Sequence, residues 1–324
     1  MAVLTRLRRP FTAGAPAASV EIAADRVTGL MLGRGPGREV RAVVTEALPD
    51  GALTPAANAT NIADRTAVGT AVSRVLKQLP GTPSRVALVV PDSAAKVSLM
   101  TFEQIPARAA DLDRLVRWQA RKTAPFRVED AQVAYSPGLP TGDGGRELIV
   151  SLMRRDIVEE YEAVCASGGG HAGVVDLASF SVVNAVLADG GVAEADWLLV
   201  HVAQGYSTIA IVRRGRLILF RNRTAEGDGN LADLVHQTRM YYEDRLQGGG
   251  FGRVFLVVSA ADTAAAEAAI LRRSLESRLG TFVEAIDLGV SGAHGPGTGG
   301  VLPDLMAAPL GLLLCERLAA ETGA

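Results

Sequence analysis

Two short apolar runs flank a polar turn in Val20-Glu21-Ile22-Ala23-Ala24-Asp25-Arg26-Val27-Thr28-Gly29-Leu30-Met31-Leu32. Such runs predict an antiparallel hairpin, and residues 39–48 supply a third strand after a glycine-rich break. The same pattern returns at residues 197–223. The repeat indicates that the fold contains one unit twice, with Glu21 and His201 at equivalent positions.

An amphipathic helix and then a buried strand follow each three-strand unit. The helices are expected at residues 68–79 and 231–242, and the strands at residues 85–90 and 254–258. The later copy adds a helix at residues 264–279 and a closing strand at residues 282–286. Two copies of one strand-strand-strand-helix-strand order predict an α/β fold made of duplicated domains.

The first copy is interrupted by a segment with a pattern of its own. Three short strands and two amphipathic helices are expected in it, which predicts a small inserted α+β subdomain that ends at a hinge formed by the glycines 168–170. The predicted organisation is a flexible N-terminal tail (1–17), a first domain in two parts (18–92 and 169–194), the inserted subdomain (93–168), a second domain (195–304) and a C-terminal helix packed on the core (305–324).

Composition excludes several classes of protein. The 324 residues are 48% hydrophobic with a net charge of −2, which argues against a disordered chain or a basic nucleic-acid binder. Cys165 and Cys315 are too far apart for a disulfide framework, and the four histidines show no metal-ligand spacing. No apolar run approaches the roughly 18 residues of a membrane span. We therefore expect a cytoplasmic protein without a metal site or a nucleic-acid partner.

The duplicated unit resembles the actin-like (RNase H-like) fold of actin, Hsp70, sugar kinases and FtsA. The position of the insertion and several local patterns resemble PilM, the actin-like protein family of type IV pilus assembly. These patterns are Leu115-Val116-Arg117-Trp118-Gln119-Ala120-Arg121-Lys122-Thr123-Ala124-Pro125-Phe126 with Tyr135 after it, the strand 217–223 followed by Glu226-Gly227-Asp228-Gly229, the pair Tyr241-Tyr242, and the ending 302–314. The resemblance covers nearly the whole chain.

The chain departs from actin-like ATPases where they bind nucleotide. Each of their hairpins begins with Asp-x-Gly, whose Asp holds Mg²⁺ and whose Gly admits the phosphates. Here Glu21 and His201 replace the acids, and Ala23 and Ala203 replace the glycines. Because a nitrogen ligand suits Mg²⁺ poorly, we expect weak or lost ATP binding and no required cofactor. The remaining candidates for a nucleotide site are Glu21, Ala24, Gln204, Gly205, Ser207 and Gly227.

The resemblance implies a structural adaptor of the type IV pilus, or of a related envelope machine. It implies a cytoplasmic protein at the inner membrane that attaches to the membrane only through partners, namely the cytoplasmic tail of a PilN-like protein and other assembly components. Two alternatives stay open. One is an active ATPase or kinase on the same fold, which would need acids and glycines in both hairpins. The other is the cytoplasmic module of a GspL-type secretion protein, which would carry a membrane span after this region.

Overall fold

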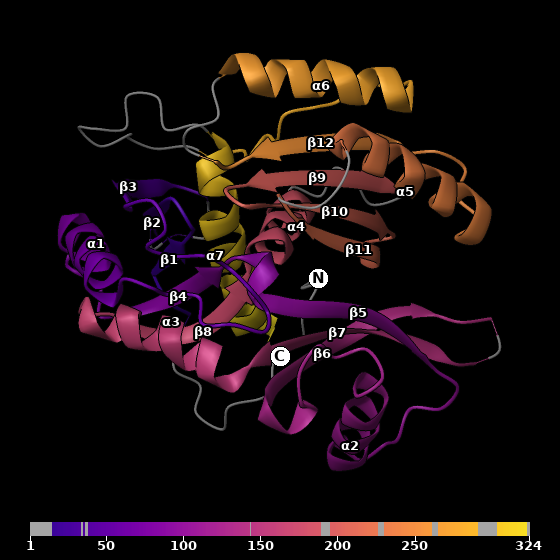
Figure 1. Ribbon diagram of the computed structural model, residues 1–324, viewed down its shortest axis with the longest axis horizontal. Coiled ribbons are helices and arrows are strands. Elements are labelled where there is room, and N and C mark those ends of the chain that lie inside the picture. The colour runs from indigo at the N-terminus through magenta and orange to yellow at the C-terminus, as the bar shows by residue number, and fades with distance from the viewer. Residues whose placement is uncertain are drawn as a thin grey trace.

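The computed structural model describes residues 15–33, 35, 38–142, 144–188, 195–225, 230–260, 265–290 and 303–322, which contain three β-sheets (Figure 1). The first sheet has five strands in the order β3-β2-β1-β4-β8. Their bounds are β1 (Ala18–Ile22), β2 (Arg26–Leu32), β3 (Val40–Ala47), β4 (Arg85–Val90) and β8 (His171–Leu177). β1 is antiparallel to β2 and parallel to β4, so the N-terminal hairpin lies in the centre of the sheet.

Helices cover both faces of this sheet. One face carries α1 (Arg65–Gln78) and α3 (Arg155–Ser167), and the other carries α4 (Ala178–Ala188) and α7 (Pro303–Thr322) (Figure 1). The Oδ1 atom of Asp64 caps α1 by accepting a hydrogen bond of 2.9 Å from the backbone N–H of Ala67. α3 joins the first domain, because its buried Ile157 and Tyr161 lie in that domain's core. We had expected this helix in the inserted subdomain.

The second sheet repeats the first. Its strands are β9 (Trp197–Ala203), β10 (Tyr206–Arg213), β11 (Arg216–Thr224) and β12 (Arg253–Val258), in the order β11-β10-β9-β12. This order matches β3-β2-β1-β4, and β9 is again antiparallel to its hairpin partner and parallel to the late strand. The prediction of a duplicated α/β unit is confirmed. α5 (Leu231–Arg245) and α6 (Ala265–Leu279) pack on one face of this sheet.

The prediction of a closing strand at residues 282–286 is wrong, because no continuous strand forms there. Only Glu284 pairs with β12, through one bridge to Phe255. Val283 and Ile286 are buried while Phe282 and Ala285 are exposed, and this spacing of three does not match the alternating burial of a strand.

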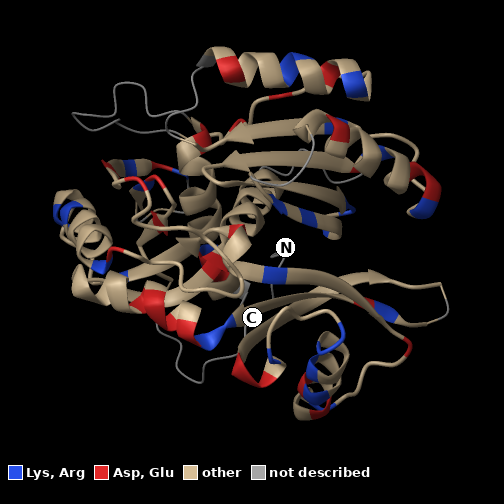
Figure 2. Ribbon diagram, viewed as in Figure 1, with Lys and Arg blue, Asp and Glu red and all other residues tan. Residues whose placement is uncertain are grey.

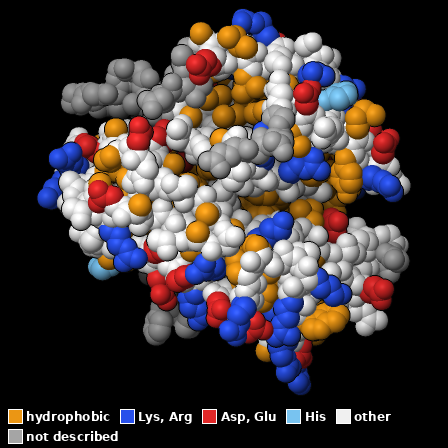
Figure 3. Space-filling model, in the orientation of Figure 1, with side chains coloured by type: hydrophobic (Ala, Val, Ile, Leu, Met, Phe, Trp, Pro, Cys, Tyr) orange, Lys and Arg blue, Asp and Glu red, His pale blue; other side chains and the backbone are white. Residues whose placement is uncertain are grey.

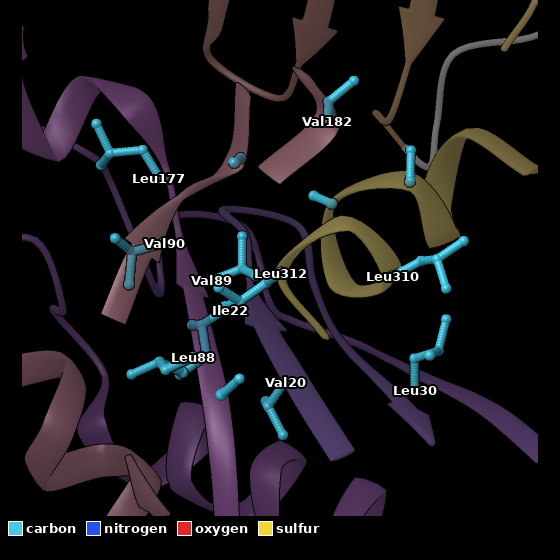
Figure 4. Close-up of a cluster of buried hydrophobic side chains, with 14 of the residues drawn as sticks. Val20, Ile22, Leu30, Leu88, Val89, Val90, Leu177, Val182, Leu310 and Leu312 are labelled. Carbon is cyan, nitrogen blue, oxygen red and sulfur yellow. The ribbon is translucent and has the colours of Figure 1, made fainter. Parts of the chain in front are cut away.

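α4 and α7 lie between the two sheets and join them into one core. Gly311 in α7 crosses α4 so closely that an added Cβ would lie 1.8 Å from the carbonyl oxygen of Ser181. Figure 4 shows apolar side chains of the first sheet meeting those of α4 and α7. The labelled members are Val20, Ile22, Leu30, Leu88, Val89, Val90, Leu177, Val182, Leu310 and Leu312. In the described part of the chain, no helix has the length and apolar content needed to cross a bilayer.

The inserted subdomain is a three-stranded sheet covered by one helix. Its strands are β5 (Ala95–Phe102), β6 (Ala131–Pro140) and β7 (Arg146–Arg154), in the order β5-β7-β6, and its helix is α2 (Ala109–Ala120). Leu148, Val150 and Leu152 face α2, while Ile149 and Met153 on the opposite face of β7 join the core of the first domain. The subdomain therefore has one face closed by α2 and one face turned toward the rest of the molecule.

The glycines after α3 serve close packing, where we had expected a hinge. An added Cβ on Gly168 would lie 2.5 Å from Cγ1 of Val72, and one on Gly170 would lie 2.9 Å from Cδ1 of Leu76. Both contacts are with α1, so the absence of side chains lets the end of α3 lie against that helix.

Candidate functional site

The first hairpin carries a buried ion pair at the expected nucleotide position. Glu21 is the penultimate residue of β1, and Arg26 is the first residue of β2 after the turn at Ala24 and Asp25. The Nη2 atom of Arg26 donates to Oε2 of Glu21 at 3.1 Å, and its Nη1 donates to Oδ1 of Asp25 at 2.9 Å. The side chains of Arg26 and Glu21 are only 1% and 5% exposed. The carboxylate that would face Mg²⁺ in an ATPase is therefore paired with an arginine of its own hairpin.

The second hairpin contributes a buried histidine that is hydrogen-bonded at both ring nitrogens. Nδ1 of His201 lies 2.8 Å from Oγ of Ser179, and Nε2 lies 2.8 Å from Oγ of Ser259. Ser179 donates its own hydroxyl hydrogen to Oδ2 of Asp92. Its oxygen is thus left to accept from Nδ1, which assigns the Nδ1–H tautomer to His201 and makes Nε2 the acceptor.

Asp92 connects the two domains. It follows β4 in a short 3-10 helix, η1 (Asp92–Ala94), and its Oδ1 accepts a hydrogen bond of 2.9 Å from the backbone N–H of Ser179. From the second sheet, Thr208 Oγ1 donates to Asp92 Oδ2 at 2.6 Å and accepts from Asn222 Nδ2 at 2.9 Å. Asn222 also contacts the first domain, because Oγ of Ser93 donates a hydrogen bond of 2.9 Å to its Oδ1. The first domain and the second sheet are therefore tied together by buried polar side chains.

Burial shifts the pKa values of these groups away from their ordinary range. Desolvation raises the pKa of Glu21, although the neighbouring Arg26 opposes this shift. Desolvation also raises the pKa of Asp92, against the hydrogen bonds from Ser179 and Thr208. Desolvation, with a smaller effect of the Arg26 charge, lowers the pKa of His201 to about 3, so the imidazole is neutral at pH 7. Burial therefore opposes the charge of both acids, and their hydrogen bonds favour it, whereas His201 is held neutral as its two serine partners require.

The predicted nucleotide-site residues are only partly brought together. Glu21 lies in the buried network, and Ala24 lies in the turn beside it, half-buried. Gln204 and Gly205 form the exposed turn of the second hairpin, where Gly205 has a φ of 83° that favours glycine. Ser207 is half-buried at the start of β10, on the strand that also carries Thr208. Gly227 lies outside the described residues.

The sequence interpretation missed Arg26, Asp92, Ser179 and Thr208. The residue pattern places Arg26 in the turn of the first hairpin, and Asp92 lies outside either hairpin. A signal for Asp92 was present, because the carboxyl ends of parallel strands meet at one edge of a sheet and Asp92 closely follows β4. Among the described residues, no cluster of His, Cys, Asp and Glu could hold a metal ion.

A second candidate site lies between the inserted subdomain and the second domain. Figure 3 shows a hollow there with hydrophobic side chains on its floor. β11 borders it on one side and contacts β5 and β6, with Nη1 of Arg216 donating to the carbonyl oxygen of Pro137 at 2.9 Å. β5 and β11 are edge strands of their sheets, and Lys and Arg residues occur on both (Figure 2). An edge strand beside an apolar floor can accept an extended peptide.

By residue type both tryptophans of the chain are expected in a core, but the insert presents one of them on its surface. Trp118 on α2 is 55% exposed, with the Nζ atom of Lys122 4.7 Å from its ring centroid. Trp197, the other tryptophan, is fully buried as expected, against Phe255.

The chain was compared with known proteins. The family model of the type IV pilus assembly protein PilM matches residues 20–245, and the search of curated proteins gives no match. Among solved structures, a PilM–PilN type IV pilus biogenesis complex matches at 14% identity with a TM-score of 0.79, over 94% of this chain and 99% of that chain. The cytoplasmic domain of EpsL, an inner membrane component of the type II secretion system of Vibrio cholerae, matches at 11% identity with a TM-score of 0.49, over 93% and 94%. A Bacteroides thetaiotaomicron protein of unknown function with an actin-like ATPase fold matches at 10% identity with a TM-score of 0.48, over 88% and 96%.

Proposed function

The chain belongs to the type IV pilus assembly protein PilM family, and from this membership we propose that it is a structural adaptor of the pilus machine. In this proposal it lies in the cytoplasm beneath the inner membrane and binds the cytoplasmic tail of a PilN-like membrane protein. The tail would lie in the hollow between β5 and β11. The observation that carries the proposal is this apolar hollow, bordered by two edge strands, in a chain of this family.

We propose further that the adaptor works without ATP. Arg26 is paired with Glu21, and its guanidinium already supplies the positive charge that a hydrated Mg²⁺ would bring to this carboxylate. His201 is neutral and uses both nitrogens on serine hydroxyls. A nucleotide would therefore have to displace a buried ion pair and a hydrogen-bonded chain before any phosphate contact formed.

The alternatives are less well supported by the residues present. A kinase or ATPase needs a carboxylate free to hold the metal, and Glu21 is paired. Family membership favours the pilus machine over a GspL-type secretion module.

Calorimetry with a synthetic peptide tests the adaptor proposal directly. The peptide is the complete cytoplasmic tail of a PilN-like protein from the same organism. Thr101→Trp places a bulky neutral side chain on the face of β5 that points away from α2, and we expect it to abolish binding. Thr123→Trp puts the same exposed side chain beyond the end of α2 and should leave binding unchanged. Absence of binding to the unmodified chain, or equal binding by both variants, would contradict the proposed site.

Calorimetric titration of the same protein with Mg-ATP tests the proposal that the adaptor works without ATP. We expect no heat of binding at millimolar nucleotide. Micromolar affinity that is lost in Glu21→Ala would favour the ATPase alternative.

A further inference from the structure

Glu147 is a half-buried carboxylate on the face of the inserted sheet that is turned toward the rest of the molecule. It lies one residue before Leu148 on β7, and Leu148 packs toward α2. Because neighbouring strand residues point to opposite faces, Glu147 shares the inner face with Ile149 and Met153. It pairs across the sheet with Thr101 of β5.

The second domain contacts the insert next to this position. Arg216 of β11 reaches the carbonyl oxygen of Pro137, and Pro137 is the residue that pairs with Leu148. Leu139, two residues further along β6, packs against the core of the second domain. Glu147 therefore lies at the end of the hollow where β6, β7 and the second domain meet.

No described residue forms an ion pair or a side-chain hydrogen bond with Glu147, although arginine is abundant in the chain. The guanidinium of Arg216 is directed to Pro137 instead. Desolvation by the surrounding protein raises the pKa of the Glu147 carboxyl, with no neighbouring charge contributing. A partly desolvated carboxylate without a cation is an incomplete site, since pairing would recover the electrostatic energy that burial removes.

Glu147 gives one end of the hollow a charge that the inner face of β5 lacks. The inner-face positions of β5 are Ala95, Val97, Leu99 and Thr101, none of which is charged, and Lys96 pairs with Leu152 on the α2 face. A cation on a bound peptide is therefore attracted to the Glu147 end. Cytoplasmic segments next to membrane spans carry an excess of Lys and Arg.

We propose that Glu147 anchors a Lys or Arg side chain of the partner's cytoplasmic tail, and that this contact fixes the direction of the tail in the hollow. The inference rests on the proposed adaptor function. In it the guanidinium or ammonium group donates to the Glu147 carboxylate, while apolar residues of the tail lie over the floor toward Val97.

A double-mutant cycle between chain and peptide tests the contact. The chain carries Glu147→Gln, which keeps the shape and removes the charge, and the synthetic tail peptide carries Gln in place of its Lys and Arg residues. We expect each change alone to weaken binding about tenfold or more, as for a charge-assisted contact. Together the two changes should weaken binding little more than either alone. Glu129→Gln, which removes an exposed charge on the α2 side of the same subdomain, is the matched control and should bind like the unmodified chain.

The outcomes separate this inference from the function on which it rests. Binding of the unmodified peptide by Glu147→Gln within about twofold of the unmodified chain overturns the anchor while the adaptor function stands. Losses from the two changes that simply add also overturn it, because the groups would then act independently. Failure of the unmodified chain to bind the peptide overturns both. Circular dichroism and thermal unfolding of each variant verify that the fold is intact.

Discussion

Arg26 and Glu21 form a buried ion pair within one hairpin, with Nη2 and Oε2 3.1 Å apart and both side chains at most 5% exposed. Arg26 sits in the hairpin where the resemblance to actin-like ATPases predicts a metal and a phosphate. Its second nitrogen, Nη1, binds Asp25 in the turn. One cation thus serves two carboxylates that would otherwise repel each other in a poorly solvated site.

Removal of the arginine should be costly for stability. In Arg26→Met the methionine fills similar space but leaves Glu21 buried without a cation, so we expect a loss of about 3–5 kcal/mol in the free energy of unfolding. Urea denaturation followed by circular dichroism measures it. The double variant Glu21→Leu with Arg26→Met removes both charges and should recover most of the loss.

Arg74→Met is the matched control for this experiment. Arg74 pairs with Glu46 at 3.7 Å on the surface, where its side chain is 65% exposed, so the change should cost less than about 1 kcal/mol. An Arg26→Met variant as stable as this control would show that Glu21 is protonated or solvated in the folded protein.

The order of strands and helices was predictable because the same order can be read independently from each half of the sequence. Period-two apolar runs, turns and one-sided helices occur in the same order twice, and the second sheet repeats the strand order of the first. The polar network was not predictable from such patterns. By sequence Arg26 follows Asp25 in a polar turn, and only the fold shows that its side chain is 1% exposed and paired with Glu21 and Asp25.

Acid should destabilise the protein through His201. The pKa of this residue is about 3 in the folded state, against 6.5 for an ordinary histidine, so between these values the unfolded chain binds a proton that the folded chain does not. Stability therefore rises with pH in this window, by up to about 1.4 kcal/mol per pH unit, and is fully present above pH 6.5. Glu21 and Asp92 act in the opposite direction, because their folded pKa values are raised.

Comparison with His201→Gln isolates the histidine from these acids. Urea denaturation at several pH values between 4 and 7 should show a shallower dependence of stability on pH in the variant than in the unmodified chain. His171→Gln, which removes an exposed histidine on β8, controls for the loss of a histidine as such. Parallel profiles for the unmodified chain and His201→Gln would mean that His201 titrates normally.

The crossing of α4 and α7 depends on one glycine. A methyl group in Gly311→Ala would lie 1.8 Å from the carbonyl oxygen of Ser181, so the helices must separate. We expect a loss of about 3 kcal/mol or more, since backbone rather than a flexible side chain has to move. Gly142→Ala, where an added Cβ meets nothing within 4 Å, should be neutral in the same thermal unfolding measurement.

Local sequence patterns also failed to predict which element covers a given apolar surface, because tertiary packing decides it. The helix at residues 155–167 has an apolar face that fits either core, and its contact with α1 places it with the first domain. Trp118 resembled a core residue by type, yet α2 turns it outward because Val116 and Ala120 already fill the face toward the sheet. Sequence periodicity identifies an apolar face but does not name its partner.

Thr208 should couple the second sheet to the first domain. Thr208→Val keeps the volume but removes a hydrogen bond of 2.6 Å to the buried carboxylate of Asp92 and leaves Asn222 without its acceptor. Because hydrogen bonds to charged groups contribute about 1.5–3 kcal/mol, we expect the free energy of unfolding to fall by an amount in this range.

The rate of amide hydrogen exchange in Thr208→Val should rise in η1 and β10, on both sides of the contact, while the inserted sheet stays protected. Ser207→Ala, at the neighbouring half-buried position, is the control and should leave both unchanged. Faster exchange confined to β10 would show that Asp92 retains its position without Thr208, and that Thr208 does not couple the second sheet to the first domain.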